Sequence, residues 1–320
     1  MAGRPRSRRS CLAVPGSNVR MIEKAQGLPA DEVFLDLEDA VAPAAKAAAR
    51  RNVISALTTG DWGGRTRVVR INDATSPWAY RDVVEVVEAA GGSLDCVMLP
   101  KVEDAGHVRW LDLTLGQIEA ALGLPVGGIG IEAQIESAAG LARVEEIAAA
   151  SPRLETLVFG PADFMASLAM PTLAVGALHP DYPGDPFHYV LLRILVAARA
   201  HDLQAIDGPY LQIRDLDGFR AAARRTAALG FDGKWVLHPD QIEPANEVFT
   251  PSQSEYDRAE LILEAYAHHT SEAGGARGAV MLGDEMIDEA SRKLALAVVA
   301  RGRAAGLRRT TGSTPPGATG

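Results

Sequence analysis

Eight short apolar runs recur between residues 11 and 237, and the stretches between them have helical character. The runs are rich in Val, Ile, Leu and Phe and end at polar, Gly or Pro residues, which is typical of buried parallel strands. They cover residues 11–14, 32–37, 67–71, 95–99, 130–135, 156–159, 204–206 and 234–237. Eight strands alternating with helices predict an α/β fold of the (β/α)8 TIM-barrel type over residues 10–250.

Four of the intervening stretches carry clear helix signals. Residues 43–57 are rich in alanine, and residues 77–90 begin at a proline and end before two glycines. Proline suits the first turn of a helix and glycine its end. The patterns of residues 187–201 and 215–229 also predict helices. A chain of 320 residues has room for one such barrel and an extension.

The alternation stops after residue 250. Residues 252–268 and 287–303 predict two helices, and the glycine-rich segment SEAGGARGAV lies between them. We therefore expect residues 251–307 to form a C-terminal helical extension and lid, since a glycine-rich hinge suits a mobile element. An extension that only packs on a neighbour fits the pattern equally well. The last residues, 308–320, are predicted to be a disordered tail.

Charge is unevenly distributed along the chain. The net charge is −9, yet residues 1–9 carry four arginines and no acid, and residues 301–320 do the same. The remainder is therefore strongly acidic, which disfavours nucleic-acid binding because phosphate neutralisation needs clustered Lys and Arg. We expect residues 1–9 to be a disordered basic arm.

The number of cysteines and the hydropathy of the sequence indicate the cellular compartment of the protein. The two cysteines, Cys11 and Cys96, lie inside apolar runs, so we expect buried packing residues rather than a disulfide. The basic start MAGRPRSRRS has no apolar segment behind it, and the sequence has no uninterrupted apolar stretch of about 18 residues. We expect a cytoplasmic protein without a secretory signal or a membrane span.

Polar residues follow the predicted strands at many positions. The active sites of barrel enzymes lie at the carboxyl ends of the strands, so these are the candidate functional residues. They are Gly16, Ser17, Asn18, Arg20, Asp36, Glu38, Asp39, Arg70, Asn72, Lys101, Glu136, Gly160, Ala162, Asp163, Asp207 and His238.

Two of these carboxylates stand out because they follow neighbouring strands. Glu136 comes directly after the fifth run, and Asp163 lies just past the sixth. Adjacent strands are about 4.8 Å apart, so the two groups can share one cation. Carboxylate oxygens suit Mg²⁺, or Mn²⁺. Alternatively, each carboxylate caps the following helix or pairs with an arginine.

Lys101 at the fourth strand end has three interpretations. It can form a Schiff base, bind a phosphate or pair with a nearby acid. The sequence has no P-loop and no G-x-S-x-G elbow, and its histidines lack metal-ligand spacing. These absences disfavour phosphoryl transfer and a serine hydrolase of the α/β type.

Several longer motifs spread from about residue 10 to residue 307. The most specific are FLDLEDAV, IEAQIESAAGL, LVFGPADF and MIDEAS, and others are VPGSNVRMIEKA, VVRIN, VMLPKVE, GDPFHY, IDGPY and GFDGKWVLHPDQIEPANEVFTPS. In this combination the chain resembles the citrate lyase β-subunit-like (HpcH/HpaI aldolase) family, and most closely its L-malyl-CoA/β-methylmalyl-CoA lyases.

The resemblance implies a set of site residues. It implies that Glu136 of the IES segment and Asp163 of the GPAD segment hold Mg²⁺. It implies catalytic roles for Arg70 and for Asp288 of the MID segment, which would reach the site of an adjacent subunit in a homotrimer or homohexamer. The substrate-binding residues would be Pro15, Gly16, Arg20, Arg70, Ala162 and Asp163.

The implied reaction is the reversible cleavage of a β-hydroxyacyl-CoA. L-malyl-CoA would give acetyl-CoA and glyoxylate, and β-methylmalyl-CoA would give propionyl-CoA and glyoxylate. Citramalyl-CoA lyase, malyl-CoA thioesterase or malate synthase, a citrate lyase β-like subunit acting with partners, and a class I aldolase using Lys101 remain alternatives. Residues 170–184 look compact where many malyl-CoA lyases have a long loop, so the acyl group stays open.

Overall fold

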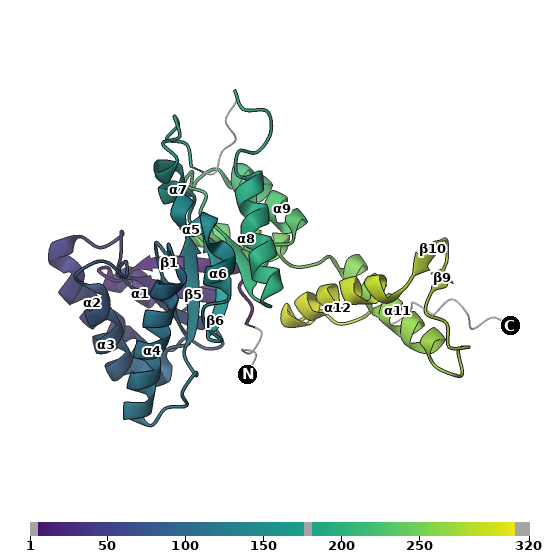
Figure 1. Cartoon of the computed structure of the whole chain (residues 1–320), viewed down its shortest axis with the longest axis horizontal. Helices are drawn as coiled ribbons and strands as arrows, with labels where there is room; N and C mark the ends of the chain where they lie inside the picture. Colours follow the sequence, from purple (N-terminus) through teal and green to yellow (C-terminus); the bar gives the residue numbers. More distant parts are fainter. Residues whose placement is uncertain (1–5, 176–180, 311–320) are drawn as a thin grey trace. The chain divides into compact units, whose positions relative to one another are not determined.

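The computed structural model describes residues 6–175 and 181–310, and the chain divides into two compact units after Phe249. Each unit is described by itself (Figure 1). Residues 1–5, 176–180 and 311–320 are outside the described residues. The compact segment expected at residues 170–184 therefore lies partly outside them.

The first unit contains a closed barrel of eight parallel strands in sequential order, as the sequence predicts. β1 pairs with β2 on one side and with β8 on the other, which closes the sheet. The strands are β1 (Ser10–Pro15), β2 (Glu32–Asp36), β3 (Thr66–Arg70), β4 (Cys96–Leu99), β5 (Gly130–Ile135), β6 (Leu154–Phe159), β7 (Gln204–Asp207) and β8 (Gly233–Val236).

Helices connect the strands and cover the outside of the barrel (Figure 1). In α3 the buried residues Val83, Val86, Val87 and Ala90 recur at helical spacing, so one face packs on the sheet. The helices of this unit are α1 (Val19–Ala25), α2 (Lys46–Thr59), α3 (Ala79–Ala90), α4 (Ala105–Leu122), α5 (Ala138–Ala142), α6 (Val144–Ala148), α7 (Pro161–Ser167), α8 (His188–Ala200), α9 (Leu216–Leu229) and α10 (Ile242–Val248).

A small apolar cluster fills the inside of the barrel. It includes Phe34, Met98 and Trp235, and the rings of Phe34 and Trp235 lie 4.8 Å apart. Cys11 and Cys96 belong to the same cluster and are free, buried thiols, as predicted. The barrel is therefore a packed core, and chemistry is confined to its ends.

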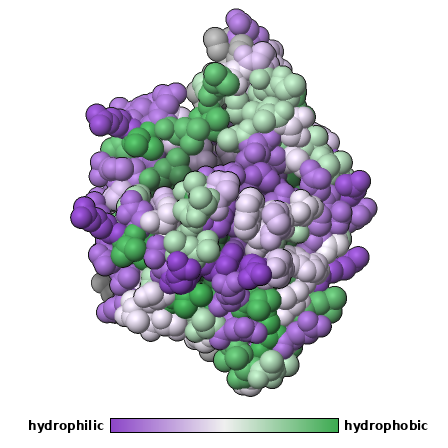
Figure 2. All heavy atoms as spheres, turned by 90° about the vertical axis from the view of Figure 1, so that its left-hand side faces the viewer, coloured by the Kyte–Doolittle hydropathy of each residue, from purple (hydrophilic) through white to green (hydrophobic). Residues whose placement is uncertain are grey.

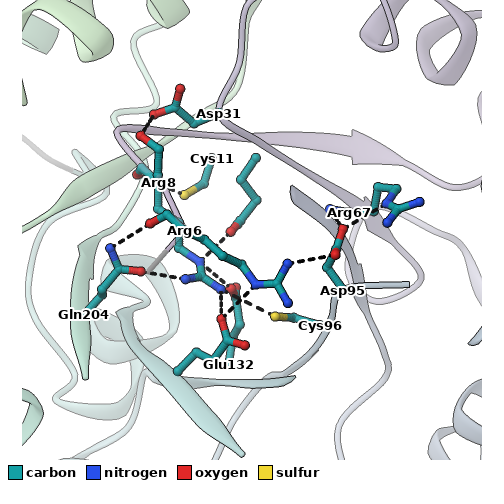
Figure 3. A network of polar contacts seen from close by, with 12 residues as sticks. Arg6, Arg8, Cys11, Asp31, Arg67, Asp95, Cys96, Glu132 and Gln204 are labelled. Atoms are coloured by element: carbon teal, nitrogen blue, oxygen red, sulfur yellow. Dashed lines mark hydrogen bonds and ion pairs between the residues drawn. The ribbon is translucent and has the colours of Figure 1, made fainter. Parts of the chain in front are cut away.

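The amino-terminal end of the barrel is occupied by Arg8 (Figure 3). This side chain is fully buried, and its Nε lies 2.8 Å from both Glu32 Oε2 and Glu132 Oε1. Its Nη2 donates to Glu155 Oε2 at 2.7 Å, and its Nη1 donates to Gln204 Oε1 at 2.6 Å. Burial and the nearby Glu32 raise the pKa of Glu132 well above its usual range.

The prediction of a disordered arm over residues 1–9 is therefore wrong for its last residues. Besides Arg8, Arg6 pairs with Asp95 at 2.7 Å and Arg9 pairs with Asp31 at 2.7 Å. Buried carboxylates on the strands need cationic partners, and the basic segment supplies them.

The second unit is a pair of helices with a β-hairpin between them. It comprises α11 (Gln253–Thr270), β9 (Val280–Leu282), β10 (Glu285–Ile287) and α12 (Glu289–Ala304). Helices were expected at residues 252–268 and 287–303, whereas the hairpin was not expected in the glycine-rich connection. Tyr256 packs against Ala295 and Val299.

The predicted disordered tail begins too early at residue 308. The side chain of Arg309 pairs with Glu264 at 2.7 Å, and the backbone N–H of Thr310 donates to Asp257 Oδ1 at 3.1 Å. The tail thus stays attached to α11 up to Thr310, because two helix carboxylates bind it. Residues 311–320 lie outside the described residues.

The surface is mixed in polarity. On the face drawn in Figure 2, hydrophilic residues lie between smaller hydrophobic areas. Within residues 6–175 and 181–310, none of the helices combines the length and the apolar character that crossing a membrane requires.

Candidate active site

A cavity of about 350 Å³ opens at the carboxyl ends of the strands. The residues that line it follow β3, β4, β5 and β6, which is where the active site of a barrel was predicted. They are Asp73, Thr75, Lys101, Glu103, His107, Glu136, Ser137, Asp163, Ala166 and Ser167. The predicted pair of carboxylates thus shares one cavity with Lys101.

Glu136 is the first residue after β5 and is buried. Its Oε1 accepts a hydrogen bond from the backbone N–H of Lys101 at 2.6 Å, and its Oε2 accepts one from Gln134 Nε2 at 2.6 Å. A Cβ at Gly160 would lie 2.4 Å from Oε2, so glycine is required there. Burial, with the charge of Glu38, raises the pKa of Glu136 to about 8.

Asp163 lies in the first turn of α7, which starts at Pro161 directly after β6. The dipole of a helix favours a carboxylate in this turn. The negative charge of Asp163 is one of the causes that raise the pKa of Glu136, so the two groups repel one another across the cavity.

This excess of negative charge fits a divalent cation. No three His, Cys, Asp or Glu side chains among the described residues converge as ligands. Mg²⁺, however, is commonly bound by one or two carboxylates and keeps several waters. Two carboxylates on one cavity, one of them buried and repelled by its neighbours, are a suitable donor set for a hard ion.

Arg70 ends β3, next to Asp36 at the end of β2. Its Nε and Nη2 donate to the two oxygens of Asp36 at 2.8 and 2.7 Å, and its Nη1 lies 3.0 Å from Glu38 Oε2. Its guanidinium also lies 5.1 Å from the ring of Trp235. Burial disfavours the cation, but the charge and hydrogen bonds of Asp36 together with the charges of Glu38 and Glu136 raise the pKa of Arg70.

Lys101 follows β4 and has a left-handed backbone, with φ of 50°. Its Nζ lies 2.5 Å from Glu38 Oε1 and 3.2 Å from Asp39 Oδ2. Burial opposes the charge, but the hydrogen bond and charge of Glu38 together with the charges of Asp163 and Asp39 raise the pKa of Lys101. A lysine that stays protonated is a poor nucleophile, so of the three interpretations the geometry favours the ion pair.

The other predicted substrate-binding residues lie outside the lining of this cavity. Gly16 follows Pro15 at the end of β1, and its N–H donates to the carbonyl of Asp36 at 2.8 Å. A Cβ at Gly16 would lie 2.8 Å from that oxygen, so a larger residue would separate the two strand ends. Arg20 on α1 and Ala162 on α7 are exposed.

Asp288 belongs to the second unit, where it caps α12. Its Oδ1 accepts a hydrogen bond from the backbone N–H of Ser291 at 3.0 Å, and this bond lowers the pKa of Asp288. The carboxylate is thus ionised at neutral pH. Its place at the mouth of a barrel stays a prediction.

Some contacts of the site were not anticipated from the sequence. Asp36 and Glu38 were recognised only as acids at a strand end. Their pairing with Arg70 was missed, and an ion pair was one interpretation of Lys101, without its particular partner. The DLED segment signals several carboxylates at one place, but it does not indicate which cation each one faces. That depends on the register of β2 against β3.

Acids and fixed cations gather at the carboxyl ends of the strands of this (β/α)8 barrel. This is the arrangement typical of a barrel enzyme. The chain belongs to the HpcH/HpaI aldolase/citrate lyase family, whose model matches residues 9–239. This membership confirms the resemblance seen in the sequence motifs.

Individual relatives agree with this assignment. The chain is 45% identical over 305 residues to the L-malyl-CoA/beta-methylmalyl-CoA lyase of Cereibacter sphaeroides, covering 92% of this chain and 94% of the relative. It is 37% identical to the malyl-CoA/beta-methylmalyl-CoA/citramalyl-CoA lyase of Chloroflexus aurantiacus, over 82% and 78% of the two chains. These relatives are CoA-thioester lyases, and the present chain is an enzyme of the same family.

Solved structures show the same architecture. The protein CitE of Mycobacterium tuberculosis, in complex with magnesium, acetoacetate and coenzyme A, matches with a TM-score of 0.72 and 29% identity. The match covers 93% of this chain and 98% of that chain. That neighbour binds magnesium.

Proposed function

We propose that the chain is a Mg²⁺-dependent lyase that reversibly cleaves L-malyl-CoA or β-methylmalyl-CoA. The products would be acetyl-CoA or propionyl-CoA, with glyoxylate. The observation that carries the proposal is the pair of Glu136 and Asp163 on one cavity. Its support is the 45% identity to a lyase with this name.

Glu136 and Asp163 would hold the Mg²⁺, with Mn²⁺ as a possible substitute. When bound, the ion supplies Lewis-acid polarisation of the substrate hydroxyl and of the glyoxylate carbonyl formed from it. Glu136 would lose its proton when the ion binds, because burial raises its pKa to about 8 without the ion. Because Gly160 has no Cβ, it leaves room for the carboxylate of Glu136 beside it.

Arg70 would stabilise the thioester enolate that leaves when the carbon–carbon bond breaks. Its guanidinium remains charged and is held in place by two hydrogen bonds to Asp36. In condensation the ionised Asp288 of an adjacent subunit would take a proton from the acyl carbon; in cleavage it would give a proton to the enolate carbon after taking up the one that the substrate hydroxyl loses. The support for this role is that the hydrogen bond from Ser291 lowers the pKa of the carboxyl group and keeps it ionised, which is the form that can take a proton.

The CoA thioester would be bound by the strand-end segment that contains Pro15, Gly16 and Arg20, together with Ala162. Residues 251–307 would act as a lid, since an enolate must be protected from water. The active assembly would be a homotrimer or homohexamer. The free thiols of Cys11 and Cys96 support a cytoplasmic location.

Incubation of the purified chain with glyoxylate, Mg²⁺ and acetyl-CoA or propionyl-CoA tests the reaction. We expect malyl-CoA or methylmalyl-CoA, identified by mass spectrometry, and its loss when EDTA removes the metal. Omission of glyoxylate is the control. If no new thioester forms with either acyl-CoA, the proposed reaction is wrong.

The outcome of this assay also distinguishes the proposed lyase from related proteins. The chain is also 38% identical to a (3S)-malyl-CoA thioesterase of Cereibacter sphaeroides, over 81% of this chain. A thioesterase or malate synthase would release free malate and CoA, and a citramalyl-CoA lyase would accept pyruvate. A citrate lyase β-like subunit would be inactive without its partners.

A class I aldolase would depend on the amine of Lys101. Because Glu38 and Asp39 hold this lysine as a cation, we expect sodium borohydride added with substrate to leave the Lys101 peptide unmodified and the enzyme active. Peptide mapping by mass spectrometry and a residual-activity assay measure this. A reduced adduct at Lys101 with loss of activity would support the Schiff-base mechanism instead.

A further inference from the structure

Glu38 is a buried carboxylate placed between the two cations of the site. It follows β2 (Glu32–Asp36), and its side chain is 5% exposed. Oε1 lies 2.5 Å from Lys101 Nζ, and Oε2 lies 3.0 Å from Arg70 Nη1. Its own backbone is fixed as well, since its N–H donates to Asp36 Oδ1 at 2.8 Å and its carbonyl accepts from Lys46 Nζ at 2.7 Å.

Arg70 and Lys101 connect Glu38 to other residues of the site. Arg70 is held on its other edge by Asp36. Lys101 donates its backbone N–H to Glu136 at 2.6 Å, from a left-handed backbone that a non-glycine residue adopts at a cost in energy. One continuous chain of contacts therefore joins the ends of β2, β3, β4 and β5.

The contact with Arg70 is electrostatic and leaves a donor available. Among the described residues, Glu38 Oε2 accepts no hydrogen bond although Nη1 lies within ion-pair distance. Arg70 can therefore stay paired with Glu38 while Nη1 donates to a substrate oxygen. A buried carboxylate is costly to desolvate and is a poor choice for stability alone, which argues for a role in the site.

We propose that Glu38 is a positioning residue of the lyase reaction, which orients Arg70 directly and Glu136 through Lys101. This inference rests on the proposed function and assigns no contact between Glu38 and substrate. Both oxygens are needed because each faces a different cation. The carboxylate of aspartate lies one methylene closer to the backbone and cannot contact both Arg70 and Lys101.

The test compares Glu38→Gln, which removes the charge, with Glu38→Asp, which keeps the charge but shortens the side chain. The matched control is Glu119→Gln. Glu119 is also a buried carboxylate, held by Arg153 at 2.9 and 2.6 Å, but it lies beside the amino-terminal end of β5. Each full-length protein is measured for kcat and KM with malyl-CoA, for Mg²⁺ affinity by calorimetry without substrate, and for Tm.

We expect both Glu38 variants to lose about 10- to 100-fold in kcat and about 10-fold in Mg²⁺ affinity, with little change in KM. Glu119→Gln should lower Tm and keep kcat and Mg²⁺ affinity. Wild-type kcat and Mg²⁺ affinity in Glu38→Asp would overturn the proposal, because charge alone would then suffice. A wild-type protein that forms no thioester contradicts the proposed function, and the calorimetric comparison still decides whether Glu38 orients Glu136.

Discussion

Replacing Glu136 by glutamine is expected to lower kcat/KM for malyl-CoA by about 1,000-fold or more. Loss of one of two carboxylate ligands removes Lewis-acid stabilisation of several kcal/mol, and about 1.4 kcal/mol corresponds to a factor of ten in rate. Glutamine has nearly the same shape and fits beside Gly160. Its oxygen can still accept the N–H of Lys101, and its NH2 group can donate to Gln134 Oε1 once that amide turns. Steady-state kinetics measures the loss in kcat/KM, and calorimetric titration with Mg²⁺ measures the accompanying loss in metal affinity.

The unfolding temperature of the metal-free variant distinguishes loss of a metal ligand from misfolding. In the metal-free protein, Glu136 is buried and repelled by Glu38 and Asp163. Glutamine removes that repulsion, so we expect the metal-free variant to unfold at the same temperature as wild type or above it. Asp163→Asn should behave in the same way. A variant that retains near wild-type activity with Mg²⁺ would contradict the metal site.

Replacing Arg8 by methionine is expected to lower the free energy of unfolding by about 3–5 kcal/mol. The substitution keeps an apolar side chain of similar length but leaves Glu32, Glu132 and Glu155 without their shared cation. Breaking a buried ion pair from one side has an effect of this size, because an uncompensated charge remains in the interior. Urea unfolding followed by circular dichroism provides the measurement.

The control for this prediction is an exposed pair. Arg193 and Glu145 lie 2.8 Å apart on the surface, so Arg193→Met should change stability by less than about 1 kcal/mol. Adding Glu132→Gln to Arg8→Met should restore part of the loss. Equal effects at Arg8 and Arg193 would show that the amino-terminal end of the barrel does not depend on the buried cation.

Most of the barrel could be predicted from sequence because each strand is buried on both faces. A run such as Cys96–Leu99 is then apolar throughout, and its ends are marked by Asp95 and Pro100. The amino-terminal segment was misjudged for the opposite reason. Arg8 counts as surface charge unless one sees that Glu32 and Glu132 stand inside apolar runs and need a partner.

The site was predictable as a set of residues but not as a network. Glu136 and Asp163 follow consecutive strands, and the pairing of β5 with β6 places them on one cavity. The pairing of Arg70 with Asp36 depends on the register of two strands, and the reach of Glu38 depends on rotamers. The contribution of Asp288 belongs to another unit of the chain and stays a prediction.

Arg8 also has a consequence for synthesis of the chain on the ribosome. It emerges among the first residues, but its partners Glu132 and Gln204 lie 124 and 196 positions later. The end of the barrel therefore cannot close before most of the first unit has been translated. Contacts of such long sequence separation form late and slowly, so nascent chains keep their acidic strand ends open until then.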